Sequence, residues 1–175
     1  LLETLTQTPS VPGREDRIRK VIEDHIRSSE LFDEVHTDAM GSLIACRRAR
    51  PAKGAAETSP RQVMLAAHMD QIGFLVRHID DKGFLRVNPV GGFDTRNLFA
   101  RGVRVCTRDG DLAGVMNPGG RPIHIATEDE KKKVPIIGDF FIDLGLGPEE
   151  VASKVQIGDM VVLDGPFRDV GEYVV

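Results

Sequence analysis

A histidine and an aspartate two positions apart, His68 and Asp70, are the most informative chemical feature of this 175-residue chain. Residues two apart on an extended segment point to the same side, so the imidazole and the carboxylate can act together. Zinc-type ions favour neutral imidazole ligands, and a carboxylate that accepts the other ring N–H fixes the tautomer and orientation of the ring. The pattern indicates one ligand of a metal site. By spacing alone, it is also typical of an ordinary hydrogen-bonded pair.

The element that must position this pair is the apolar run just before it. Val63 to Ala67 form a nearly continuous apolar stretch, which predicts a strand buried on both faces of an α/β sheet. Ligands of such sheets bind beyond the carboxyl ends of the strands. We therefore expect His68 and Asp70 at the sheet edge where chemistry takes place.

Six segments in order along the chain resemble the dinuclear-metal glutamyl and deblocking aminopeptidases, a family that builds tetrahedral assemblies. The segments are Ser10–Glu15, Thr37–Ile44, Ala67–Phe74, Val90–Gly92, Arg121–His124 and Phe141–Gly145. Their shared order is far more specific than any one short motif. The resemblance implies two divalent ions, zinc or cobalt, with His68 as a ligand of one ion and Asp70 as the group that orients His68. Gln71 departs from the family pattern, which usually has an acidic residue at this position.

The resemblance also indicates what this sequence lacks. Members of the family supply the other metal ligands and the catalytic glutamate from later segments, which begin with an Asp-Arg motif. The sequence stops at Val175, just before the position where that motif is expected, and no later acidic cluster replaces it. We therefore expect the N-terminal half of a metal-dependent aminopeptidase, inactive alone because most of its ligands are missing. The metal, the preferred N-terminal residue and the reason for the end at Val175 stay open.

The composition of the chain limits the classes of partner that it is expected to bind. Lys and Arg number 23 and Asp and Glu number 27, a net charge of −4, so no broad basic field predicts nucleic-acid binding. No apolar stretch approaches the roughly 20 residues of a membrane span, and a signal pattern is lacking. Cys46 and Cys106 are far apart, which favours reduced thiols while leaving a disulfide open. We expect a soluble, cytoplasmic protein that acts on peptides and self-associates, as the resemblance implies.

The chain pattern divides into an α/β part and a β-rich part. Apolar spacing predicts a helix over 14–27, a strand pair over 32–37 and 43–47, and a loop over 48–61. Later segments predict short strands in hairpins over 74–87 and 103–115, a helix over 148–154 and a strand over 160–163, which is typical of a small barrel or sandwich. The mixed charges of 128–133 indicate a surface loop.

The resemblance implies a metallopeptidase α/β sheet domain interrupted by a small β-barrel that serves in dimerisation. The expected division is the N-terminal part of the sheet domain over 1–70, the inserted barrel over 71–164, and a return segment over 165–175.

Two other classes of protein stay open. One is a non-catalytic assembly or regulatory subunit, whose β domain binds full-length relatives and whose His68 is vestigial. The other is a glycanase, a label that related sequences have carried. Glycoside hydrolysis usually needs two carboxylates about 5 to 9.5 Å apart and no metal. The sequence offers no obvious pair of that kind.

Overall fold

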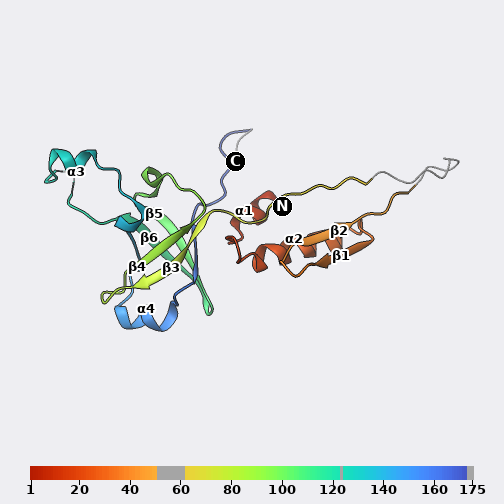
Figure 1. The fold of residues 1–175 in the computed structure, drawn as a ribbon, viewed down its shortest axis with the longest axis horizontal. Coiled ribbons are helices and arrows are strands. Elements are labelled where there is room, and N and C mark those ends of the chain that lie inside the picture. The colour runs from red at the N-terminus through yellow and green to blue at the C-terminus, as the bar shows by residue number, and fades with distance from the viewer. Residues whose placement is uncertain (51–61, 123, 173–175) are drawn as a thin grey trace.

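The computed structural model describes residues 1–50, 62–122 and 124–172. Two parts are visible, an N-terminal helix–hairpin unit and a six-stranded barrel (Figure 1). The N-terminal unit contains α1 (Leu2–Gln7), α2 (Asp16–Ser28), β1 (Glu34–Thr37) and β2 (Leu43–Cys46). Most of the loop predicted over 48–61 lies outside the described residues.

Local sequence signals explain the N-terminal unit, and both of its predicted elements are confirmed. Helix α2 buries Ile18 on its apolar face. Strands β1 and β2 pair in antiparallel register from Glu34 with Cys46 to Thr37 with Leu43. The turn between them is held by Asp38, which accepts hydrogen bonds from the backbone N–H groups of residues 40 and 42 at 2.9 and 2.8 Å. These bonds stabilise the carboxylate and hold the pKa of Asp38 below its usual value.

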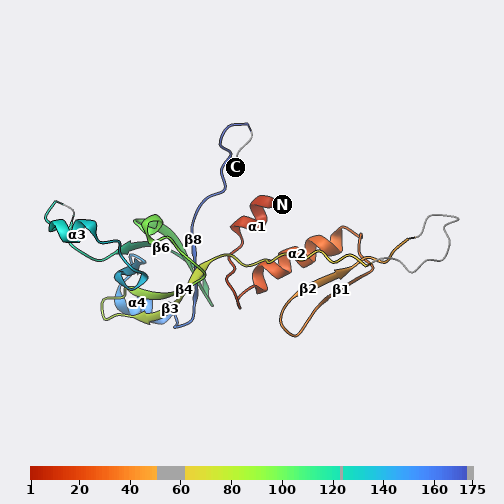
Figure 2. The ribbon, with the colours of Figure 1, turned by 45° about the horizontal axis from the view of Figure 1, so that its top comes forward.

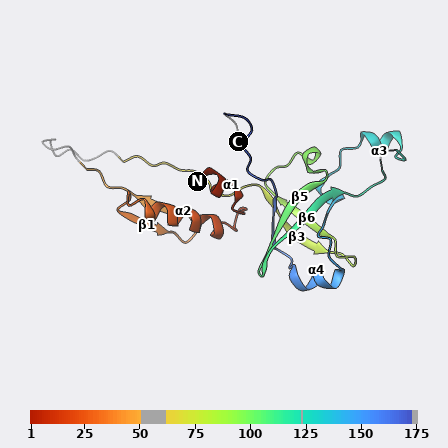
Figure 3. The same cartoon turned by 180° about the vertical axis from the view of Figure 1, so that it is seen from behind.

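The six later strands form a closed antiparallel barrel with the strand order β3-β4-β7-β6-β5-β8 (Figure 3). Its strands are β3 (Gly73–Ile79), β4 (Leu85–Val90), β5 (Arg101–Thr107), β6 (Gly110–Pro118), β7 (Phe140–Asp143) and β8 (Met160–Leu163). Both predicted hairpins are confirmed, as β3–β4 and β5–β6. Closure of the sheet leaves no open edge. That this barrel interrupts a sheet domain, with boundaries at 71 and 164, stays a prediction.

Alternating side chains fill the barrel. Phe74 and Val76 of β3, and Val103 and Val105 of β5, are almost wholly buried, as the two-residue period of a strand requires. Other members of the core are Leu85, Val87, Leu98, Met116, Phe140, Ile142, Val151, Val155 and Val161. Val151 belongs to the predicted helix, found as α4 (Pro148–Lys154), which therefore packs against the barrel core.

Three short helical elements complete the described structure. They are η1 (Thr95–Leu98), α3 (Glu128–Lys132) and η2 (Ile137–Asp139). The charged run predicted as a surface loop instead contains α3, because Thr127 and Glu130 form a reciprocal capping box at its start. Figure 2 shows α3 projecting from the barrel. No described helix is long and apolar enough to cross a membrane.

The predicted strand over Val63 to Ala67 does not form, and this prediction was wrong. These residues have no regular structure, and Leu65 is 93% exposed. A strand buried on both faces needs hydrogen-bonded neighbours and layers above and below it. Among the described residues, none of the assigned strands pairs with this segment. It forms part of the long connection between the N-terminal unit and the barrel (Figure 2).

Candidate functional site

The imidazole of His68 and the carboxylate of Asp70 lie in contact at the end of this connection. Nδ1 of His68 is 2.9 Å from the backbone oxygen of Asp70 and 3.3 Å from its carboxylate oxygen Oδ1. The side chain of His68 is 82% exposed, whereas that of Asp70 is 29% exposed. The two residues that the sequence singles out are therefore brought together, with the imidazole facing solvent.

The hydrogen-bond partner of His68 Nδ1 decides which ring nitrogen of His68 is available to bind a metal. The backbone oxygen of Asp70, which can only accept a hydrogen bond, is the partner of Nδ1, so Nδ1 of a neutral His68 carries the proton. Nε2 then presents its lone pair away from Asp70. A neutral imidazole with one nitrogen held by a carboxylate and the other free is the form in which histidine binds metals.

The donor set fits one metal ligand rather than a whole metal site. No group of three or more His, Cys, Asp or Glu side chains that could hold an ion is found within residues 1–50, 62–122 and 124–172. Zinc sites usually have at least three protein ligands. His68 and Asp70 therefore supply fewer donors than such a site needs.

Two close contacts hold the segment that carries His68 and Asp70 in place, one at Met69 and one at Gly73. The hydroxyl of Ser10 donates to the backbone oxygen of Met69 at 3.1 Å. A few residues later, Gly73 begins β3 so close to Val11 and Val161 that any larger residue would collide with them. Ser10 lies in a segment that supports the family resemblance, but the sequence alone indicated no role for it.

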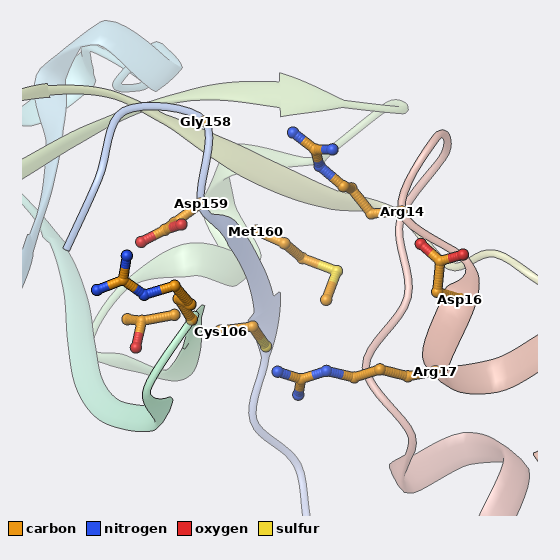
Figure 4. A pocket seen from close by; sticks show the side chains of 9 residues that line it. Arg14, Asp16, Arg17, Cys106, Gly158, Asp159 and Met160 are labelled. Carbon is orange, nitrogen blue, oxygen red and sulfur yellow. The ribbon is translucent and has the colours of Figure 1, made fainter. Parts of the chain in front are cut away.

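A separate open cleft of about 290 Å³ lies between the start of α2 and the barrel (Figure 4). It is lined by Arg14, Arg17, Cys106, Asp159 and Met160, among others, and neither His68 nor Asp70 belongs to it. Arg17 reaches across to the start of β6, where it donates to both carboxylate oxygens of Asp111 at 2.8 and 2.9 Å. The cleft is thus a contact region between the N-terminal unit and the barrel.

Cys106 does not turn this cleft into a nucleophilic site. Burial, reinforced by the negative charge of Asp111, raises the pKa of the Cys106 thiol to about 12. The thiol therefore stays protonated at neutral pH, and only the thiolate is a strong nucleophile or metal ligand. The predicted free thiols agree with the structure, in which neither Cys46 nor Cys106 is paired.

With this geometry established, residues 42–175 match the model of the M42 glutamyl aminopeptidase family. The chain belongs to this family, which confirms the resemblance. A lysyl aminopeptidase of Pyrococcus furiosus is 35% identical over 157 residues, which cover 89% of this chain and 42% of that protein.

Solved structures share the fold. An aminopeptidase of the archaeon Desulfurococcus kamchatkensis superposes with a TM-score of 0.82 at 33% identity, over 98% of this chain and 44% of that one. The TET1 peptidase of Pyrococcus horikoshii, described as assembling into a tetrahedron or a large octahedral shell, gives 0.75 at 32% identity, over 93% and 45%. A Thermotoga maritima protein described as an endoglucanase gives 0.76 at 30% identity, over 98% and 47%.

The chain spans less than half the length of the curated relatives it matches, between 42% and 47% for three of them.

Proposed function

We propose that this chain is part of a metal-dependent aminopeptidase that removes N-terminal residues from peptides. The observation that carries the proposal is the arrangement of His68, whose Nδ1 faces Asp70 while Nε2 is left free, in a chain of the M42 family. His68 would bind one of two divalent ions, zinc or cobalt. Asp70 would hold the proton on Nδ1, fix the ring orientation and strengthen Nε2 as a donor.

A bound pair of divalent ions would lower the pKa of a shared water and polarise the scissile carbonyl. His68 and Asp70 supply only part of this centre. The other ligands and the glutamate that moves the proton would come from outside the described residues, since these contain no complete group of ligands. On this proposal the chain has no activity until that second part is present.

The exposed apolar segment that begins at Val63 supports the proposal that a second part of the enzyme lies outside the described residues. Val63, Met64 and Leu65 are almost fully exposed, although their side chains are those of a buried strand. Further strands on either side would bury these side chains and pair their backbone.

The test is made on the native protein, isolated from its own cells together with whatever completes it. About two zinc or cobalt ions per chain, together with chelator-sensitive hydrolysis of aminoacyl p-nitroanilides, would support the aminopeptidase. Absence of any hydrolysis, with a longer relative co-purified, would favour the non-catalytic subunit. Hydrolysis of a cellulose substrate that survives chelation would favour the glycanase, the reading that matches the description of the Thermotoga maritima protein.

We expect replacement of Asp70 by Ala to weaken zinc binding by about 10- to 100-fold, because His68 then loses the group that fixes its tautomer and orientation. Competition against a chromophoric chelator measures the zinc affinity of the native assembly. Asp81→Ala is the matched control, since Asp81 is an exposed carboxylate in the β3–β4 turn. Unchanged zinc affinity and unchanged hydrolysis in Asp70→Ala would remove Asp70 from the mechanism.

Self-association through the barrel is the second element of the proposal. Among the described residues from 99 to 136, five large apolar side chains are about half exposed or more, whereas those of the core are buried. They are Phe99, Val115, Ile125, Val134 and Ile136. Large apolar groups left exposed to solvent are a feature of surfaces that bind another protein. The assembling TET1 peptidase of Pyrococcus horikoshii supports a contact between copies of this chain.

Val134→Asp should therefore shift the protein toward smaller species, because a charge buried in an interface without a partner is costly. Light scattering coupled to size-exclusion chromatography measures the change. Met40→Asp, in the exposed turn between β1 and β2, is the control outside the barrel. An unchanged assembly in Val134→Asp would place the interface on another surface.

A further inference from the structure

Ser10 holds both peptide groups of Asp70. Its hydroxyl donates to the backbone oxygen of Met69 at 3.1 Å, and its own backbone oxygen accepts from the N–H of Gln71 at 3.2 Å. The first bond fixes the Met69–Asp70 peptide group, and the second fixes the Asp70–Gln71 peptide group. Ser10 is 2% exposed, so water does not compete readily for these bonds.

The second of these bonds acts directly on the contact with His68. In a trans peptide group the N–H and the C=O point in opposite directions. Because the N–H of Gln71 is turned toward Ser10, the carbonyl of Asp70 is turned away from it. That carbonyl oxygen lies 2.9 Å from Nδ1 of His68. The orientation of one peptide plane thus links Ser10 to the imidazole.

Ser10 can act as an anchor because its own position is fixed on the barrel. Val11 is wholly buried and packs in one cluster with Cys106, Met160 and Val162. After it the chain turns through Pro12 and Gly13, and the N–H of Arg14 donates to the carbonyl of Val11 at 2.8 Å. Gly13 has a φ of 80°, a left-handed conformation that glycine adopts without strain.

We infer that Ser10 is a positioning residue that sets the geometry of the His68–Asp70 pair. The inference rests on the proposed function of that pair as a metal ligand and its support. It also gives a role to the Ser10–Glu15 segment, since the buried turn after Ser10 keeps the anchor in place. Residues 62–72, the described part of the connection that carries His68, have no regular structure, so the conformation near Asp70 depends on these two bonds.

The test compares Ser10→Ala with Thr107→Val. Thr107 is the other buried polar residue in the described structure, and its hydroxyl donates to the carbonyl of Gly110 at 2.6 Å. Each substitution removes one buried hydroxyl from one backbone carbonyl, but only the first touches the Asp70 segment. We expect about tenfold weaker zinc binding in the native assembly for Ser10→Ala, little change for Thr107→Val, and recovery in Ser10→Thr.

Amide hydrogen exchange in the metal-free protein gives a readout that is independent of activity. Ser10→Ala keeps the backbone oxygen that accepts from Gln71 but loses the hydroxyl bond to Met69, so the segment should open more often. The amide of Gln71 should therefore be protected in the unmodified protein and should exchange faster in Ser10→Ala than in Thr107→Val. An unprotected Gln71 amide in the unmodified protein would overturn the inference even if Ser10→Ala fails to fold. So would equal exchange and equal zinc affinity in the two variants.

His68→Ala separates failure of this inference from failure of the proposed function. If His68→Ala leaves zinc binding unchanged, the metal role of the pair is wrong, and the exchange of Gln71 still decides whether Ser10 anchors the segment. If His68→Ala loses zinc while Ser10→Ala behaves like Thr107→Val, the metal ligand stands and the positioning role of Ser10 is wrong.

Discussion

His68→Ala is expected to lower zinc affinity at one of the two proposed sites, and aminopeptidase activity, by more than about 100-fold. Loss of a group that only supports a ligand costs about 10- to 100-fold, and loss of the ligand itself costs more. His68 presents Nε2 to solvent while Nδ1 is held by Asp70, so no other side chain of the pair replaces the lost donor. Elemental mass spectrometry of the native assembly gives the zinc content, and kcat/KM on an aminoacyl anilide gives the activity.

The matched control is His78→Ala. His78 is an exposed histidine on β3, and no role in metal binding is proposed for it. Both variants remove one exposed imidazole, so a general effect of losing a surface histidine would appear in both. Full zinc content and full activity in His68→Ala would exclude His68 as a ligand and would leave the non-catalytic subunit as the better reading.

Gly73→Ala is expected to destabilise the protein by about 1 to 3 kcal/mol, the usual range for adding a methyl group to a filled interior. A Cβ atom at Gly73 would lie 2.4 Å from Cγ1 of Val11 and 2.6 Å from the backbone oxygen of Val161. The valine side chain has little room, because Val11 is wholly buried. The oxygen belongs to β8, which pairs with β3, so relief would require a shift of a barrel strand.

Equilibrium unfolding in urea measures this change, and Gly92→Ala is the control. A Cβ atom at Gly92 would meet no heavy atom within 4 Å, so the free energy of unfolding should change by less than about 0.5 kcal/mol. Equal stability of the two variants would show that β3 and Val11 are not packed as described. Because Val11 follows Ser10, Gly73→Ala should also weaken zinc binding in the native assembly.

Local patterns explain which elements the sequence predicted correctly. Helix α2 was expected over 14–27 and lies at Asp16–Ser28, because its apolar spacing and charged face are properties of one segment. The hairpins β3–β4 and β5–β6 were also expected, since each depends on two short strands and a turn. The contact between His68 and Asp70 follows from a spacing of two residues, and its role in metal binding stays a proposal.

Features that depend on distant residues were decided only by the tertiary structure. The apolar run from Val63 to Ala67 looked like a buried strand, but burial requires neighbours that the run cannot specify, and the described residues supply none. The closure of the barrel places β8 between β3 and β5, a pairing that no hairpin pattern contains.

The sequence by itself thus determined the local elements, the family and the pair of residues with chemical potential. The tertiary structure alone decided that Ser10, 59 positions before Met69, holds the peptide groups beside His68. The physical reason is the range of the interactions. Helical spacing, turns and a His-x-Asp motif act within a few residues, whereas a buried serine finds its carbonyl only after the chain has folded around the barrel.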